Sequence, residues 1–282
     1  MRILTRRDTG LLTQWTFGSS SFDSDASAFI IAAGITNQTQ QTAINSLVVE
    51  LKGYSIWTKL NAIYPFVGGT ATTHKFNLKN PADTNAAFRL VFSGGVTHGA
   101  NGVSFNGTNG YADTFLTAST TLSANNNSLG YYSRTSVASS SASAIDMGGV
   151  PDINADASLF CLIIRRNTSN QSLFAANTSS SLSIASTTVA DGSGLFVGSI
   201  ISSSSRKLYR NGSSIASTLT TAVQSLPAQK IYIGCISNNN VAGFFSNREC
   251  AFASIGSGLT DTESTNLYTA VQAFQTTLGR QV

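Results

Sequence analysis

The clearest structural signal in the sequence is the stretch Lys207-Leu208-Tyr209-Arg210-Asn211-Gly212-Ser213-Ser214-Ile215-Ala216. Two short strand-like segments flank the pair Asn211-Gly212. This pair supplies two residues that tolerate positive φ, which a tight two-residue turn between antiparallel strands requires. The stretch therefore predicts a β-hairpin, and it indicates the kind of structure to expect in much of the chain.

Strand-like patterns continue from Ala62 onwards. Phe88, Leu90 and Phe92, for example, lie at alternate positions, as in a strand with one buried face. The candidate strands are short and are bounded by Gly, Asn and Ser, which is the spacing expected of an antiparallel sandwich. They cover residues 75–78, 88–93, 128–134, 159–167, 172–176, 182–187, 194–202, 207–210, 230–235 and 248–254.

Helical patterns precede these strands. Asp23 or Ser24 can cap a first short helix, and Thr36 can cap a second one that Gly53 ends. Apolar residues of the second helix recur at helical spacing and form one stripe: Ala43, Ile44, Leu47, Val48 and Leu51. We expect a small helical subdomain over residues 23–61.

A third helical turn and a closing helix complete the predicted elements. Trp57 and Leu60 are expected in the core, because aromatic residues at helical spacing usually pack. Residues 260–263 fit a capping box, in which Thr260 and Glu263 satisfy each other's backbone donors. The helix that follows ends at Gly279 and carries the stripe Leu267, Val271, Phe274 and Leu278.

The chain therefore divides into three parts. Residues 1–22 form a leading arm, which is too short to bury itself and should be ordered only against the rest of the protein or a partner. Residues 23–61 form the helical subdomain. Residues 62–282 form a mainly β domain, an antiparallel β-sandwich with a C-terminal helix.

Composition restricts the functional classes. The chain is 41% hydrophobic and 11% charged, which argues against disorder for most of its length. Its net charge is +4, but the basic residues are scattered, unlike the basic stripe of a nucleic-acid-binding protein. We therefore expect no nucleic-acid partner. Arg2, Arg6 and Arg7, with Trp15 further along the arm, are predicted to anchor the arm on a partner surface.

The cysteines and the N-terminus bear on the cellular compartment. Cys161, Cys235 and Cys250 form no CxxC pair, and Cys161 and Cys235 lie in apolar runs where cysteine is usually buried. This pattern favours assembly in a reducing cytoplasm. Residues 1–8 lack the apolar core of a secretory signal, and no apolar run approaches the length of a membrane span.

Several segments resemble the concanavalin A-like lectin and glucanase superfamily, especially its laminin-G-like domains. GVSFNGTNGYAD (102–113) is similar to an early strand–turn–strand signature, and LYRNG (208–212) is similar to a hairpin of the family. IYIG (231–234), FASI (252–255) and LTDTE (259–263) resemble the closing strands and terminal helix. Because order and spacing match along the β domain, the resemblance implies a concanavalin A-like jelly roll.

A second resemblance concerns two longer runs. AIYPFVGGTATTHK (62–75) and LYTAVQAFQTTLGRQV (267–282) are similar to virion proteins of phages that infect Bacteroidetes-type bacteria, crass-like phages among them. In those proteins the helical stretch before the sandwich also recurs, so the resemblance covers about 23–282. It implies a particle component, such as a spike, a tail fibre or a capsid decoration.

Because the superfamily includes glucanases, catalysis has to be weighed. A glycosidase needs two facing carboxylates, but Glu50 lies on a predicted helix, Glu263 in a cap, and Glu249 has no acidic residue two positions away. The candidate general bases of a nucleophilic triad are His74 and His98, and no serine lies in a Gly-x-Ser-x-Gly elbow. His98 is beside glycines and is expected in a polar turn. The sequence predicts no enzyme activity.

Two binding sites are candidates. Asp152, Asn154 and Asp156 resemble half of a calcium loop without its bidentate Glu, and solvated turn residues are the alternative. A glycan site would combine an aromatic ring that stacks on a sugar with neighbouring amides. The candidates for such a site are Phe244, Phe245, Asn239, Asn240 and Tyr111. No cofactor other than Ca2+ is suggested.

The sequence therefore favours a phage virion structural protein that displays a lectin-like sandwich for attachment to the host surface. A carbohydrate-binding adhesin is the alternative, and a glycan-degrading enzyme is a third reading. The expected partners are other virion proteins, a second copy of the chain in a homo-oligomer such as a trimer, and a host-surface glycan. We expect the protein on the virion surface after synthesis in the host cytoplasm without a signal peptide.

Overall fold

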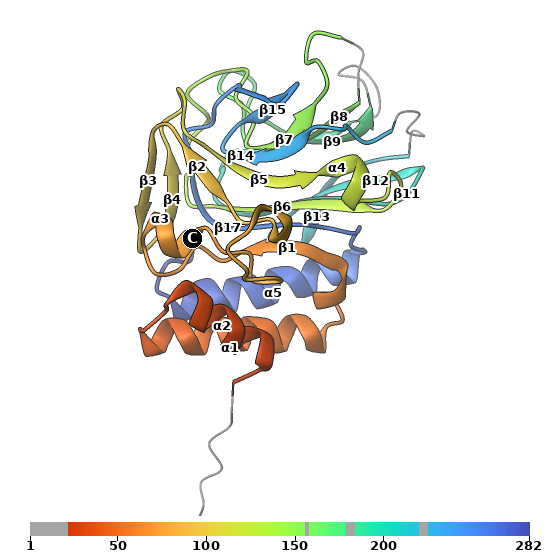
Figure 1. Ribbon diagram of the computed structural model, residues 1–282. Coiled ribbons are helices and arrows are strands. Elements are labelled where there is room, and N and C mark those ends of the chain that lie inside the picture. Colours follow the sequence, from red (N-terminus) through yellow and green to blue (C-terminus); the bar gives the residue numbers. More distant parts are fainter. Residues whose placement is uncertain (1–21, 156–157, 179–183, 220–224) are drawn as a thin grey trace, which may run out of the picture.

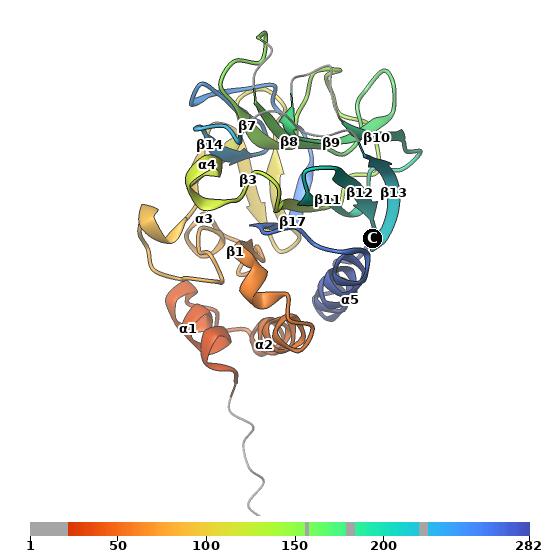
Figure 2. The same cartoon turned by 90° about the vertical axis from the view of Figure 1, so that its right-hand side faces the viewer.

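The computed structural model describes residues 22–155, 158–178, 184–219 and 225–282. In this part of the chain, two mainly antiparallel sheets of eight and nine strands pack face to face as a sandwich. Three helices lie together beneath one sheet, on the side away from the other sheet (Figures 1 and 2). We call the sheet beside the helices the helix-side sheet and the other one the far sheet. The predicted fold class is confirmed.

In the helix-side sheet, half of the neighbouring pairs along the main path join strands that are distant in the sequence. β1 pairs with β17 beside this path. The order of the path is β13 (Ser213–Thr218), β12 (Ser205–Arg210), β11 (Gly194–Ser202), β6 (Asn127–Ser133), β17 (Glu249–Gly256), β4 (Gly102–Phe105) and β3 (Val96–Gly99), and β1 is Leu60–Tyr64.

The far sheet carries the remaining strands. β15 pairs in parallel with β7 and antiparallel with β16. The order of the main path is β10 (Ala185–Thr188), β9 (Gln171–Thr178), β8 (Leu159–Ile163), β7 (Met147–Val150), β14 (Lys230–Ile233), β5 (Tyr111–Thr117) and β2 (Val91–Ser93). β15 is Ile236–Asn238 and β16 is Val241–Gly243.

The hairpin predicted from Asn211-Gly212 is present between β12 and β13. Arg210 pairs with Ser213, so two residues form the turn. Asn211 and Gly212 have φ values of 51° and 77°, which are positive as the predicted turn requires.

Two of the helices begin at the capping residues predicted from the sequence. Asp23 caps the first helix, and the capping box of Thr260 and Glu263 opens the last one. Thr36 was the wrong cap for the second helix: the Asn37 side chain accepts the Gln40 N–H and begins it. The helices are α1 (Ser24–Ala33), α2 (Gln38–Gly53), α3 (Ala71–His74), α4 (Ala118–Thr121) and α5 (Asp261–Thr277), with short 3-10 helices η1 (Trp57–Lys59) and η2 (Asn85–Ala87). None of the described helices has the length and hydropathy needed to cross a membrane.

The strand predicted over 75–78 was wrong, and the start of the 88–93 strand was too early. The side chain of Asn77 accepts the Ile63 N–H and donates to the Ala87 carbonyl, so side-chain bonds replace a strand ladder there. Phe88 ends η2 with φ 60°, a conformation that a strand does not allow.

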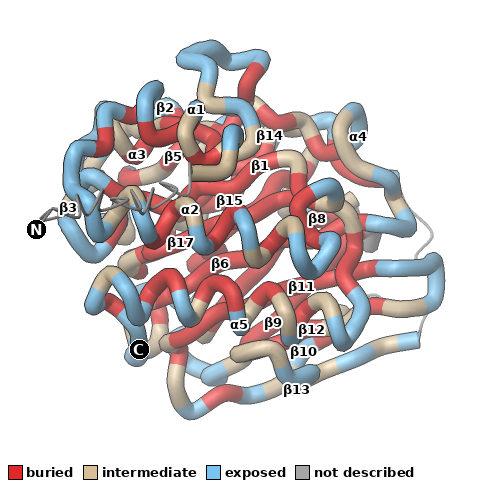
Figure 3. The backbone as a smooth tube through the Cα atoms, turned by 90° about the horizontal axis from the view of Figure 1, so that it is seen from below, coloured by how far each residue is buried: buried red, intermediate tan, exposed pale blue. Residues whose placement is uncertain are grey.

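Apolar side chains form one core between the sheets and another between the helix-side sheet and the helices. Along β6 and β11 the two cores take alternate residues: Tyr131 and Phe196 point between the sheets, whereas Tyr132 and Val197 point towards the helices. Trp57 is buried in the helical core, as predicted. Figure 3 shows α2 and α5 side by side across the buried strands.

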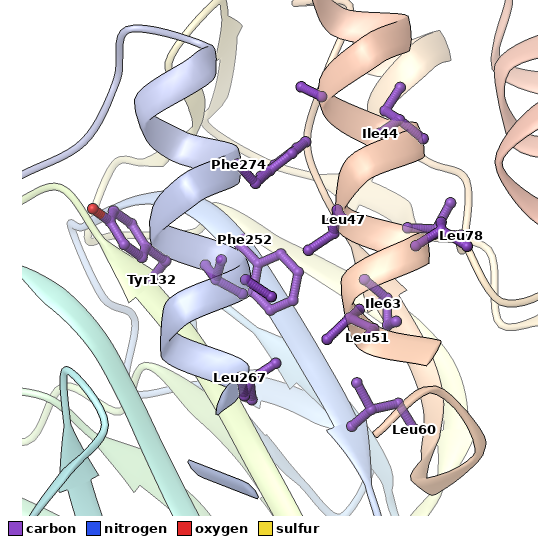
Figure 4. Packing of buried hydrophobic residues seen from close by; sticks show 14 of the residues in the cluster. Ile44, Leu47, Leu51, Leu60, Ile63, Leu78, Tyr132, Phe252, Leu267 and Phe274 are labelled. Carbon is purple, nitrogen blue, oxygen red and sulfur yellow. The ribbon is translucent and has the colours of Figure 1, made fainter. Parts of the chain in front are cut away.

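The helical core joins three parts of the chain (Figure 4). Leu47 and Leu51 of α2 face Phe252 of β17 and the apolar side of α5, which carries Leu267 and Phe274. The apolar stripes predicted for both helices therefore pack on the sandwich and on each other. One outer face of the sandwich is covered in this way, and the other is the outer face of the far sheet.

Candidate functional site

The outer face of the far sheet carries an apolar cluster of its own. Leu159, Cys161 and Ile163 of β8 point outward, while the residues between them point into the sandwich. Leu173 of β9 lies in the same outer cluster. Because none of the described helices covers these side chains, other segments of the chain have to shield them from water.

A pocket lies where this shielding is incomplete. Its volume is ≈ 220 Å³, below the ~300–1,000 Å³ of sites for drug-sized ligands, so it suits one small ligand unit. Its lining is mostly aliphatic: Ala142, Ser143, Ile145, Ile153, Leu159, Cys161, Ile163, Arg166, Leu173, Ile184 and Phe244. Among these described residues there is no carboxylate.

Backbone contacts fix the wall opposite the strands. The Ile145 N–H donates to the Phe244 carbonyl at 2.8 Å, which joins two distant segments above β8. Phe244 has φ 58°, an uncommon value for a bulky residue, and its side chain packs against the outer cluster. The wall is therefore built from specific long-range contacts.

A buried ion pair lies behind this wall. Arg248 Nε is 3.1 Å from Asp146 Oδ1, and both side chains are fully buried. Asp146 also accepts the Ile164 N–H at 2.7 Å and the Ser246 hydroxyl at 2.5 Å. The Arg248 guanidinium donates further to the carbonyl of Arg165 at 2.8 Å. Since Ile145 precedes Asp146, this network holds the pocket wall against the end of β8.

The pocket contains one cationic side chain, Arg166. Its Nε is buried and has no hydrogen-bond partner within the described residues. Cys161, which also lines the pocket, gives no compensating negative charge, because burial raises the pKa of its thiol to about 12. The guanidinium is thus available to an anionic group of a ligand.

An aromatic row lies elsewhere on the same sheet. The rings of Tyr111 and Tyr232 stack with centroids 5.0 Å apart, and Phe245 lies 6.4 Å from Tyr111. The Tyr232 hydroxyl donates to the Asn240 carbonyl at 3.1 Å. Much of the row's aromatic surface is therefore taken up by contacts within the protein.

The structure brings the five residues predicted for glycan binding together only in part, with Tyr232 linking Tyr111 to Asn240. Tyr111 and Phe245 belong to the aromatic row, whereas Phe244 lines the pocket. Asn239 and Asn240 form the exposed turn between β15 and β16, with φ values of 50° and 61°. Glycan contact by these residues stays a prediction.

The other predicted site residues are only partly described. Asp152 accepts the Asn154 N–H at 2.9 Å in a turn, and Asp156 lies outside the described residues, as do Arg2, Arg6, Arg7 and Trp15. Within the described part of the chain, no three His, Cys, Asp or Glu side chains are grouped as metal ligands. Calcium binding and anchoring by the arm stay predictions.

The two histidines meet at the edge of the helix-side sheet. His98 lies on β3, so its expected place in a polar turn was wrong, and its Nδ1 is 3.0 Å from Nδ1 of His74. The Gly69 N–H donates to His74 Nε2, which leaves Nδ1 of His74 as the donor to His98. Burial, followed by the nearby His98 and Arg280, lowers the pKa of His74 to about 3.

Sequence reasoning missed Arg166 and the aliphatic pocket residues. A signal was available in Leu159–Ile163, where every residue is apolar, so that both faces of the strand must be covered. The unpaired state of Arg166 had no comparable signal, because it depends on which groups from other segments come near it.

No family model matches this sequence, and no curated protein matches it. Solved structures with a similar fold include botulinum neurotoxin type C (10% identity, 77% of this chain, 53% of that chain, TM-score 0.50). Others are the K499G mutant of NanB sialidase from Streptococcus pneumoniae (13%, 61% and 27%, 0.43) and domain 4 of the arabinanase AbnA from Geobacillus stearothermophilus (15%, 74% and 98%, 0.42). This chain therefore spans about a quarter of the sialidase and half of the neurotoxin chain. The likeness to the neurotoxin concerns the fold alone, a β-sandwich.

Proposed function

We propose that the protein is a non-catalytic attachment module that binds carbohydrate on the outer face of its far sheet. The observation that carries this proposal is the pocket between β8, β9 and Phe244, which holds a polar anchor, Arg166, in an apolar lining. Small-molecule sites commonly combine a mainly apolar concave surface with a few convergent polar groups.

The position of the pocket supports a binding role. In Figure 1 the helices α1, α2 and α5 lie beneath the helix-side sheet, whereas the outer cluster that lines the pocket belongs to the far sheet. Botulinum neurotoxin type C, which shares the sandwich fold, is described as depending on two ganglioside molecules to enter cells. That comparison concerns the fold alone, and the proposal therefore depends on the pocket.

Charge placement favours binding over hydrolysis. Glu249 pairs with Arg134 at 3.0 Å, and Glu263 pairs with Lys59 at 2.6 Å. The described lining of the pocket offers no carboxylate pair to protonate a leaving group and activate water.

A glycan array followed by calorimetry on the full chain tests this function. We expect binding to a restricted set of glycans, and Phe244→Ala should weaken it because Phe244 lines the pocket. Val241→Ala is the matched control, since Val241 is 68% exposed on the adjacent hairpin. Silence across the array, or equal losses in the two folded variants, would contradict the proposal.

We further propose that the helical layer attaches the module to a phage particle. The resemblance of residues 62–75 and 267–282 to phage virion proteins supports this. In addition, Ile31 and Val49 on the helices are 79% and 50% exposed, respectively. Exposed apolar side chains on a layer opposite the pocket suit a contact with another virion protein or a second copy of the chain.

Particle assembly in the presence of variants tests this second role. Ile31→Ser with Val49→Ser should lower incorporation into particles while leaving the melting temperature nearly unchanged, because both side chains are exposed. Normal incorporation, or absence of the protein from purified particles, would contradict the attachment role. Light scattering of the purified chain would show whether it forms a homo-oligomer.

A further inference from the structure

The pocket contains a cationic side chain, Arg166, whose buried Nε has no hydrogen-bond partner among the described residues, whereas neighbouring cations have partners. Arg165, the preceding residue, donates to the Ser136 carbonyl at 2.7 Å and to Asn170 Oδ1 at 3.1 Å. Arg248 behind the wall is paired with Asp146. By contrast, Arg166 Nε is buried and has no hydrogen-bond partner within the described residues, and Arg166 lines the pocket.

An unpaired guanidinium at a pocket wall selects for a particular ligand group. A buried donor without an acceptor is unfavourable, and a ligand that supplies the acceptor removes this cost. The planar guanidinium fork matches a carboxylate, which can accept two parallel hydrogen bonds. Arg166 therefore favours a ligand that carries an oxyanion, and in a sugar acid that group is a carboxylate.

The rest of the lining restricts the ligand further. Ile145, Ile163 and Leu173 offer no hydrogen bonds from their side chains, so sugar hydroxyls placed against them would lose their water partners without replacement. A methyl group makes no hydrogen bonds with water and would therefore lose none against this wall. Ser143 adds a hydroxyl that can donate to an amide carbonyl. These contacts suit a short N-acyl group.

We propose that the pocket recognises a sugar that bears both a carboxylate and an N-acyl group, with Arg166 binding the carboxylate and the aliphatic wall holding the acyl methyl. This inference rests on the proposed carbohydrate-binding function and names its ligand class. An N-acyl amino acid has the same two groups, so the test includes one.

Calorimetry with the full chain separates the contributions of the carboxylate, the N-acyl group and the sugar ring to binding. The probes are the methyl glycoside of N-acetylneuraminic acid, its methyl ester, N-acetylglucosamine, glucuronic acid and N-acetylalanine. We expect the free acid to bind tightest, and the ester to lose about 10- to 100-fold in affinity because its hydrogen bonds to a charged acceptor are lost. N-acetylglucosamine and glucuronic acid each lack one group and should bind more weakly than the acid.

Variants assign the effect to Arg166. Arg166→Gln should lower affinity for the acid by about 10- to 100-fold and leave affinity for the ester nearly unchanged, and Arg166→Lys should fall between. Arg165→Gln is the control, because Arg165 is engaged with Ser136 and Asn170 and does not line the pocket. Melting temperatures exclude unfolding as the cause.

The outcomes distinguish this inference from the function on which it rests. Equal binding of acid and ester, or equal losses in Arg166→Gln and Arg165→Gln, would overturn the inference while leaving carbohydrate binding in place. If N-acetylalanine bound as tightly as the sugar acid, the inference that the carboxylate and the N-acyl group belong to a sugar would be overturned. Absence of binding by every glycan on the array would overturn both proposals.

Discussion

On both outer faces of the sandwich, every second side chain of a strand points outward, but different parts of the chain pack on the two faces. On the helix-side sheet, outward side chains such as Tyr132 and Phe252 are sealed beneath α2 and α5. On the far sheet, Cys161 and Ile163 point outward in the same way, but loops cover them only in part. The difference shows that an apolar outer row becomes part of a core or the lining of a pocket according to what packs on it.

Breaking the ion pair behind the pocket should have the largest effect. Asp146→Ala leaves the buried Arg248 without its counter-ion and should lower the free energy of unfolding by about 3–5 kcal/mol. Urea denaturation measures this change. Asp191→Ala is the control, because Asp191 is 43% exposed in its pair with Arg210, and it should cost less than about 1 kcal/mol. Equal effects would show that the pocket wall does not depend on the buried pair.

The same substitution on each face tests the comparison directly. Leu47→Ala and Leu159→Ala should each cost about 2–5 kcal/mol, with Leu47→Ala at the upper end. Leu47 lies between a helix and the sheet, whereas Leu159 already borders the pocket, where its loss enlarges a space that water can enter. Denaturant titration of both variants gives the difference. A larger loss for Leu159→Ala would mean that the far face is the better packed one.

Acid should weaken the helix side of the molecule first. The folded pKa of His74 is lowered to about 3, so the folded protein keeps it neutral while the unfolded chain binds a proton below pH 6.5. Stability therefore falls as pH falls from about 6.5 towards 3, by roughly 2 kcal/mol between pH 6.5 and pH 5. His74→Gln should flatten this dependence. Hydrogen exchange that accelerates at β8 before it does at α3 and β3 would contradict the assignment.

The cap of α5 should give the smallest effect. Thr260→Ala removes the side chain that accepts the Glu263 N–H and should cost about 1 kcal/mol. Thr262→Ala, at an exposed position in the same turn, should change stability by less than about 0.5 kcal/mol. Thermal melting of the two variants tests whether the cap helps to hold α5 over the helix-side sheet.

Features that depend on neighbouring residues could be predicted from the sequence. Asn211-Gly212 specified a hairpin because its two positive φ values are a local requirement. Thr260 and Glu263 specified the start of α5 in the same way. Local signals also misled where a distant contact decided the outcome, as at Asn77, whose side chain binds the backbone of β1 in place of a strand ladder.

Contacts between distant segments determine which outer face the helices cover and which one carries the pocket. Because every residue of β8 is apolar, its sequence shows that both faces of this strand need cover. The path of the chain, however, places α2 and α5 on the helix-side sheet. The meetings of Phe244 with Ile145 and of Asp146 with Arg248 depend on the pairing of distant strands and loops. In the part of the chain that the structure describes, Arg166 Nε lacks a hydrogen-bond partner for the same reason, since a side chain's partners are set by the surrounding fold and not by its neighbours in sequence.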